Sequence, residues 1–315
     1  MKTKAMLAVM SCFLGSTLTF GQAPAQPQQP AAEKQTPVTA IPGVIAAGAR
    51  FQRVWTGQRS ADGVIGEADG SVLLLEQRAQ RVSRVTNDGK ITPWLEDTNE
   101  VGGIAIDPRG RYITAERDIP RVRVLHPERR ILADTFEGKP IGRLADIVGD
   151  TKGGVYVTEL PTSSVLYLNP AGQLARVGPD IPGANGIMLS PDERTLYVTN
   201  TQAGLLAFDV QPDGSLRNRR PFAKPEGGQD GLAVDATGRL YIASDLGVQV
   251  YSPQGQHVGL IPTPRDITSL AFAGPDKKTL YIIGRGHDGP GGGEGDARSL
   301  YKLPMIAEGF KGRAK

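Results

Sequence analysis

Apolar residues alternate with polar ones in six similar segments of the chain. Each segment begins with a small or polar residue, usually followed by Gly, and runs through two alternating apolar positions and a turn into a second apolar strand. The segments are DGVIGEADGSVLLLE from Asp62, GGIAIDPRGRYITAE from Gly102, ADIVGDTKGGVYVTE from Ala145, NGIMLSPDERTLYVTN from Asn185, DGLAVDATGRLYIAS from Asp230 and TSLAFAGPDKKTLYIIG from Thr268. Their starts are 40, 43, 40, 45 and 38 residues apart. A period of about 40–50 residues with this alternation predicts one four-stranded blade of a β-propeller per repeat.

The repeat therefore predicts an all-β, six-bladed β-propeller with four-stranded antiparallel blades. A propeller must close its ring, because a free sheet edge exposes unpaired backbone groups. Residues 50–56 (RFQRVWT) precede the first repeat and have the pattern of a strand. We expect this strand to complete the last blade, next to residues 299–303; the alternative is a cap outside the ring.

The first residues of the chain have the pattern of an export signal. Lys2 and Lys4 precede an apolar run, residues 5–20, that is followed by small residues. We therefore predict a signal peptide at 1–23, a Pro/Gln-rich linker at 24–46, and a propeller at 47–315 in the periplasm or outside the cell. A lipoprotein modified at Cys12 and an uncleaved membrane anchor are the alternatives, although the run is shorter than the ~20 residues of a membrane span.

Composition narrows the possible chemistry. The 36 basic and 33 acidic residues leave a net charge of +3, which is too small to favour nucleic acid as a partner. The 40 Gly and 24 Pro fit many short strands joined by turns. Cys12 is the only cysteine, so a chain without its signal peptide has no thiol nucleophile and no disulfide. Three histidines and no Gly-x-Ser-x-Gly motif give no sign of a Ser-His-Asp triad.

One column of the repeat could carry a metal. The first residue of each repeat precedes the innermost strand, where the blades meet at the central channel. The column consists of Asp62, Gly102, Ala145, Asn185, Asp230 and Thr268. Two carboxylates and one amide oxygen suit a hard divalent cation, and Ca²⁺ fits best, with Zn²⁺ or Mn²⁺ as alternatives. The competing interpretation is that Asp-Gly and Asn-Gly simply form turns.

The chain resembles the senescence-marker-protein/gluconolactonase family, which includes regucalcin and bacterial sugar lactonases. The most specific segments are PGANGIMLSPDERTLYVTN (182–200) and QDGLAVDATGRLYIAS (229–244). This resemblance implies a six-bladed propeller that hydrolyses lactones with one divalent cation in its channel. It implies that Asn185 and Asp230 bind the metal and that Asp230 is also the catalytic acid/base.

Two positions depart from the family pattern. Asp62 stands where the family has a metal-binding Glu, and Ala145 stands where it has an Asn that reaches metal or substrate. Asp62 is still expected to bind the metal, and Arg143 and Asp146, from the same segment as Ala145, are the expected substrate-binding residues. A guanidinium suits a polyhydroxylated or anionic substrate, although Arg143 could also be an ordinary surface residue.

Three functions follow from these observations. The first is metal-assisted hydrolysis of a small-molecule lactone, with Asp230 assisting the attack of water. The second is a propeller of this family that binds a ligand or partner without catalysis. The third is a quinone-dependent sugar dehydrogenase, which would be expected to have a catalytic His and basic cofactor contacts that the repeat lacks. The Gly-rich segment 284–296 is interpreted as a mobile rim loop, with a second metal site as the alternative.

Overall fold

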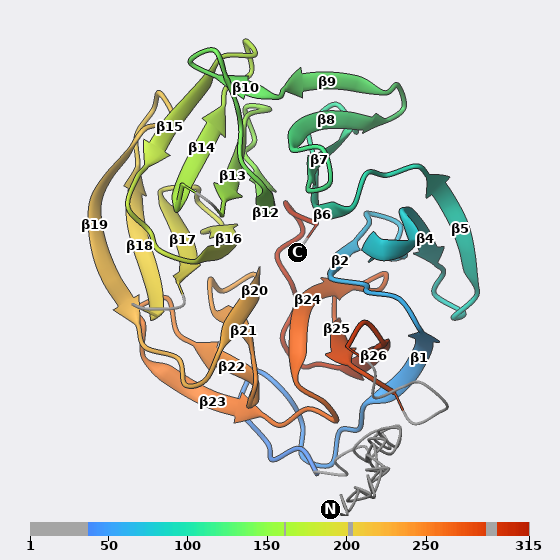
Figure 1. The fold of residues 1–315 in the computed structure, drawn as a ribbon. Coiled ribbons are helices and arrows are strands. Elements are labelled where there is room, and N and C mark those ends of the chain that lie inside the picture. The colour runs from blue at the N-terminus through green and yellow to red at the C-terminus, as the bar shows by residue number, and fades with distance from the viewer. Residues whose placement is uncertain (1–36, 161, 201–203, 288–294, 315) are drawn as a thin grey trace, which may run out of the picture.

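Six antiparallel sheets are arranged around a central axis (Figure 1). This computed structural model describes residues 37–160, 162–200, 204–287 and 295–314. Each sheet has four strands, so the predicted six-bladed all-β propeller is confirmed. The predicted signal peptide and residues 24–36 of the predicted linker lie outside the described residues.

The first three blades follow one another along the chain, and the innermost strand comes first in each. Blade one contains β2 (Gly63–Gly66), β3 (Val72–Glu76), β4 (Arg81–Val85) and β5 (Ile91–Glu96). Blade two contains β6 (Val101–Ile106), β7 (Tyr112–Glu116), β8 (Arg121–His126) and β9 (Arg130–Ala133). Blade three contains β12 (Leu144–Gly149), β13 (Val155–Glu159), β14 (Ser164–Leu168) and β15 (Leu174–Gly178). A small hairpin of β10 (Thr135–Phe136) and β11 (Lys139–Pro140) joins blades two and three.

The last three blades complete the ring. Blade four contains β16 (Ala184–Leu189), β17 (Thr195–Asn200), β18 (Gly204–Val210) and β19 (Leu216–Ala223). Blade five contains β20 (Gln229–Val234), β21 (Leu240–Ser244), β22 (Gly247–Tyr251) and β23 (His257–Ile261). Blade six contains β24 (Ile267–Ala273), β25 (Thr279–Arg285), β26 (Arg298–Pro304) and, as its outermost strand, β1 (Gln52–Gly57).

Strand β1 closes the ring as the sequence predicts. It pairs antiparallel with β26, from Gln52 opposite Lys302 to Gly57 opposite Arg298. A strand from the beginning of the chain thus completes a blade built from its end. The closure covers the edge of β26, which would otherwise expose unpaired backbone groups.

The apolar alternation of the repeat marks the packing between blades. The residues two positions after each repeat start are all at most 1% exposed: Val64, Ile104, Ile147, Ile187, Leu232 and Leu270. Alternation places these side chains on one face of each innermost strand, where they fill the space between neighbouring sheets.

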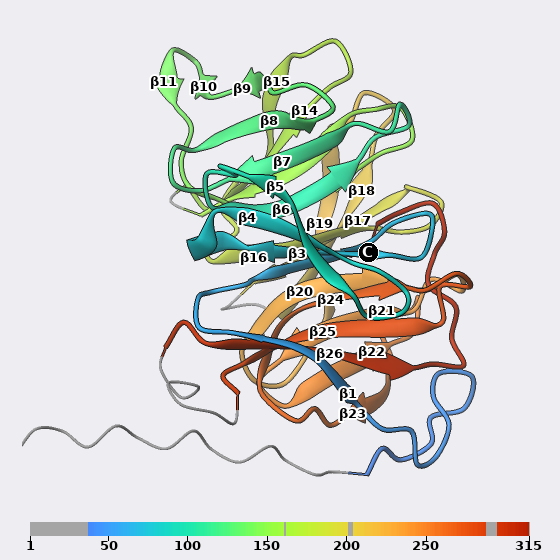
Figure 2. The same ribbon diagram turned by 90° about the vertical axis from the view of Figure 1, so that its right-hand side faces the viewer.

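The chain after β26 covers one end of the channel (Figure 2). The amide of Gly66, at the end of β2, donates to the carbonyl of Ala314 at 2.6 Å, and the amide of Phe310 donates to Val234 at the end of β20 at 3.1 Å. The Nζ of Lys277 donates to the carbonyl of Arg313 at 2.7 Å. These contacts join the C-terminal segment to the ends of the innermost strands, and a cavity of about 350 Å³ lined by Gly66, Gly149 and Arg313 among others lies at this end. The predicted column lies at the opposite end, where the innermost strands begin.

Residues 38–45, which the sequence analysis assigned to the linker, pack against the propeller. Val44 and Ile45 are at most 1% exposed and lie in the apolar cluster of blades five and six. The carbonyl of Val44 accepts hydrogen bonds from the amides of Ile306 and Ala307 at 2.9 and 3.0 Å. The packed part of the chain therefore begins near residue 38 and not at residue 47.

Helical structure is nearly absent from the described ranges. They contain one short 3₁₀ helix, η1 (Gln77–Ala79), which follows β3. No helix in these ranges is long and apolar enough to cross a membrane.

Candidate functional site

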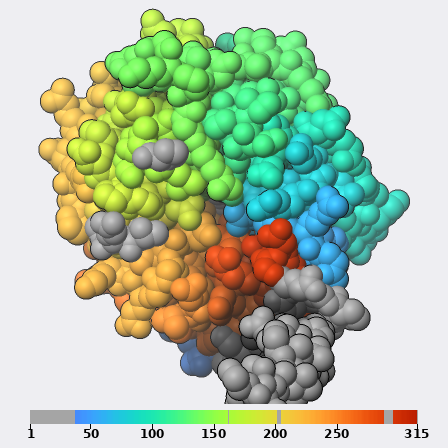
Figure 3. Space-filling view, viewed as in Figure 1, coloured from blue at the N-terminus to red at the C-terminus, as the bar shows by residue number. Residues whose placement is uncertain are grey.

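The ring brings the predicted column together. All six column residues line one small cavity at the end of the channel where the innermost strands begin: Asp62, Gly102, Ala145, Asn185, Asp230 and Thr268. The cavity has a volume of about 20 Å³, which is enough for one water-sized species. Side chains fill much of the middle of the ring on this face (Figure 3). The site is therefore a small cavity lined by both polar and apolar residues and not an open pore.

Irregular strand pairing surrounds two of the column residues that line the cavity, Asn185 and Asp230. The register between the two inner strands shifts between Ala184 and Ile187 in blade four and between Gln229 and Leu232 in blade five. Asn185 and Asp230 lie within these shifts, inside β16 and β20 and not in hairpin turns. The interpretation of the two dipeptides as simple turns is therefore wrong. Such bulges re-aim side chains and are common beside active sites.

Threonine hydroxyls of the second strands fix the backbone of two column residues. The Oγ1 of Thr158 donates to the carbonyl of Asn185 at 2.6 Å, and the Oγ1 of Thr199 donates to the carbonyl of Asp230 at 3.0 Å. Each bond joins one blade to the next. At Gly186 an added Cβ would lie 2.2 Å from the carbonyl oxygen of Asp230, so this close approach of blades four and five requires Gly.

Arg117, which the sequence analysis did not identify, occupies the blade-three side of the cavity. Its Nη1 donates to Oδ2 of Asp62 at 2.9 Å. Its Nε and Nη2 donate to the carbonyls of Leu144 and Ala145 at 3.0 and 2.8 Å. The missing side chain of Gly102 makes this possible, because a Cβ there would lie 2.4 Å from Nε of Arg117. The glycine pair at 102–103 is the only sequence signal that could have suggested room for the side chain of Arg117 in the cavity.

Asp230 has the most perturbed carboxyl group of the cavity. The pKa of Asp230 is raised to about 8, chiefly by burial and next by the nearby Asp62 carboxylate, whose effect is larger than the opposing effect of the Arg117 guanidinium. Arg285 also lowers this pKa and Asp146 raises it. Two carboxylates sharing a small enclosed space disfavour each other's charge, and a cation between them would relieve this.

The donor set fits one hard divalent cation. Asp62, Asn185 and Asp230 line the cavity with carboxylate and amide oxygens, and the buried Oγ1 of Thr268 has no hydrogen-bond partner among the described residues. Within the same residues no group of three or more His, Cys, Asp or Glu is placed to hold a metal. A cation here would therefore depend on the amide, the hydroxyl and water as well as on the two carboxylates, which suits Ca²⁺ better than Zn²⁺.

The two predicted substrate-binding residues have different environments. Arg143 is exposed next to β12, and its carbonyl accepts a hydrogen bond from the amide of Leu160 at 2.9 Å. Asp146 lines the cavity, but it is buried and accepts bonds from the amides of Ile147 at 2.8 Å and Ile187 at 3.1 Å. Asp146 therefore joins blades three and four, and a role of either residue in binding substrate stays a prediction.

The Gly-rich segment 284–296 is only partly described. His287 is buried and its Nε2 lies 3.0 Å from Nε2 of Gln58, within hydrogen-bonding distance. Asp288 and Glu294, which the second-metal-site alternative requires, lie outside the described residues.

The fold and the cavity define a class of protein: a six-bladed propeller with an acidic, oxygen-lined site at one end of its channel. Residues 51–284 match the model of the SMP-30/gluconolactonase/LRE-like region, and the chain belongs to this family.

Similar proteins of known name agree with this assignment. Pentonolactonase XacC of Haloferax volcanii is 30% identical over 233 residues, which cover 68% of this chain and 79% of that protein. The gluconolactonase of Zymomonas mobilis is 26% identical over 267 residues, covering 70% and 75%. The solved structure of XC5397, described as a gluconolactonase of Xanthomonas campestris, superposes with a TM-score of 0.73 at 26% identity and covers 89% of this chain and 99% of that one.

Proposed function

We propose that this protein is a divalent-cation-dependent hydrolase of small lactones, with sugar lactones as the substrate class. The observation that carries the proposal is the convergence of Asp62, Asn185 and Asp230, from blades one, four and five, on one cavity. The names of the pentonolactonase and gluconolactonase relatives support the reaction type.

The chain's own residues supply the ligands and a proton acceptor. Asp62, Asn185 and Asp230 would hold the cation, and Ca²⁺ is the ion that their oxygens favour. When bound, the cation would polarise the lactone carbonyl and stabilise the negative charge that develops on its oxygen. A carboxylate oxygen of Asp230 would accept a proton from the attacking water. The ring C–O bond then breaks, the ring oxygen takes up a proton, and the product is a hydroxy acid.

Acid release from a panel of γ- and δ-lactones of sugar acids tests this function in a pH-stat. The wild-type protein with Ca²⁺ should release acid from at least one of them, a chelator should abolish the release, and Asp230→Ala should lower kcat by at least about 10²-fold. Equal rates with Ca²⁺ and with chelator would contradict the mechanism. Ligand binding without any turnover would favour the non-catalytic propeller instead.

We further propose that the protein is exported. The proposal rests on the basic and then apolar pattern of residues 1–23. In a bacterial host the full chain should appear in the periplasm or medium with about the first 23 residues removed, as N-terminal sequencing would show. The matched control lacks residues 1–23 and should stay in the cytoplasm. Full-length protein in the cytoplasm would contradict export.

A further inference from the structure

Arg117 occupies the side of the cavity where Ala145 contributes no polar side chain. Its guanidinium donates three hydrogen bonds: to Asp62 across the channel and to the carbonyls of Leu144 and Ala145. The side chain of Arg117 is only 10% exposed, and that of Asp62 is 19% exposed. A largely enclosed ion pair with three directed bonds is more than a surface contact.

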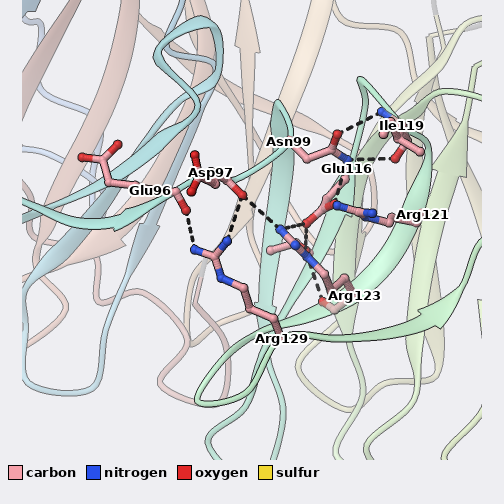
Figure 4. A network of polar contacts seen from close by, with 9 residues as sticks. Glu96, Asp97, Asn99, Glu116, Ile119, Arg121, Arg123 and Arg129 are labelled. Atoms are coloured by element: carbon pink, nitrogen blue, oxygen red, sulfur yellow. Dashed lines mark hydrogen bonds and ion pairs between the residues drawn. The ribbon is translucent and has the colours of Figure 1, made fainter.

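The residues next to Arg117 in the chain make several hydrogen bonds and ion pairs. Glu116, the preceding residue, accepts bonds from Asn99 at 2.7 Å, from Arg121 at 2.6 Å and from Arg123 at 2.5 Å (Figure 4). The amide of Ile119 donates to Oδ1 of Asn99 at 3.0 Å, and Nδ2 of Asn99 donates to the carbonyl of Ile119 at 2.8 Å.

The loop that supplies Asn99 has an unusual backbone. Asp97, Asn99 and Glu100 all have positive φ angles, of 53, 56 and 50°. Such conformations cost energy in residues other than glycine and persist where the surroundings fix them. This loop and the Glu116 contacts form one support for the turn of residues 117–119. The backbone next to Arg117 is therefore fixed by these contacts, and its side chain is fixed by the three bonds given above.

The two carboxylate oxygens of Asp62 have different environments. Oδ2 is bonded to Arg117, and Oδ1 has no hydrogen bond among the described residues. Arg117 also places a full positive charge at the wall of a cavity suited to a cation. That charge opposes cation binding, while the ion pair keeps Asp62 in a single orientation.

We propose that Arg117 is a positioning residue that directs one oxygen of Asp62 toward the cation and at the same time limits the affinity for that cation. The inference rests on the proposed function of the cavity. On this inference, blade two contributes the side chain that positions Asp62 on the side of the cavity next to Ala145. Weak, reversible cation binding and an oriented Asp62 are the two consequences, and they can be measured separately.

Calcium titration by isothermal calorimetry tests the first consequence in wild type, Arg117→Gln and Arg117→Lys. Removing a neighbouring positive charge should tighten Ca²⁺ binding by Arg117→Gln about tenfold or more. Arg117→Lys keeps the charge and should bind Ca²⁺ about as weakly as wild type. The matched control is Arg81→Gln, which removes an arginine of blade one that is paired with a different carboxylate, that of the buried Glu76. It should leave the affinity unchanged.

Lactone hydrolysis at saturating Ca²⁺ tests the second consequence. Both Arg117 variants should have a lower kcat, because neither Gln nor Lys can bond to Asp62 while also making the two bonds to the carbonyls of Leu144 and Ala145 that fix the guanidinium. If Arg117 had only a structural role, its replacement would weaken Ca²⁺ binding and lower kcat together. Binding by Arg117→Gln that equals or is weaker than wild type, or no binding by either, would overturn the proposal. The proposed function is tested separately by the wild-type protein. If wild type shows no cation-dependent hydrolysis, the proposed function fails, whatever the Arg117 variants do.

Discussion

Asp230 carries a strongly shifted carboxyl group, because burial and the neighbouring Asp62 are the main causes that raise its pKa to about 8. Without a cation, this carboxyl group is mostly protonated at pH 7. A protonated carboxyl is a poor metal ligand and cannot accept a proton from water. Cation binding and proton loss at Asp230 are therefore coupled, as is general for sites whose ligands must be deprotonated.

Calcium affinity should accordingly depend on pH. Below about pH 8 each bound ion displaces one proton from Asp230, so the affinity should rise about tenfold per pH unit between pH 6 and 8 and level off above. Calorimetry in two buffers of different ionisation enthalpy would count the released protons. A constant affinity from pH 6 to 9, with no proton release, would disagree with this account of Asp230.

The blades were predictable from sequence because each strand alternates apolar and polar residues and each repeat restarts the pattern. The same regularity located the column, including Asp62, Asn185 and Asp230, since equivalent positions in a ring converge on its axis. Arg117 lies outside that column, and its contacts with Asp62 and blade three arise only from the ring geometry. The segment around Val44 and Ile45 has no repeat and is too short to predict a strand, so its packing was missed.

The packing of that segment can be tested with Ile45→Ala. Ile45 is 1% exposed, and large-to-small substitutions of a buried Ile cost about 2–5 kcal/mol in the free energy of unfolding. Denaturant unfolding should show this loss. The neighbouring Ala46 is exposed, and Ala46→Ser should leave stability nearly unchanged. If both variants unfold like wild type, residues 38–45 do not contribute to the packed domain.

A cation in the channel would connect blades that are far apart in sequence. Asp62, Asn185 and Asp230 belong to three separate sheets, and the unfolded chain does not hold them together. Such a ligand binds the native state and stabilises it by mass action. Folding of the propeller therefore forms the site, and cation binding is expected to raise the free energy of unfolding of the propeller.

Thermal unfolding with and without Ca²⁺ checks this coupling. At a Ca²⁺ concentration of about 100 times Kd, the stabilisation is about 2.7 kcal/mol, which should raise Tm by about 5 °C. Asn185→Ala removes one ligand without changing the charge and should reduce the shift. A Tm that Ca²⁺ does not change in wild type would argue against a cation shared by the three blades.

The most direct measurement is the rate of acid release from a sugar δ-lactone by wild type and Asp230→Asn, each saturated with Ca²⁺ as confirmed by calorimetry. Asn keeps an oxygen ligand but is a far weaker proton acceptor. The account predicts cation-dependent hydrolysis by wild type and a kcat at least about 10²-fold lower in the variant. Equal kcat values for the two cation-loaded proteins would contradict the role of Asp230 and with it the proposed mechanism.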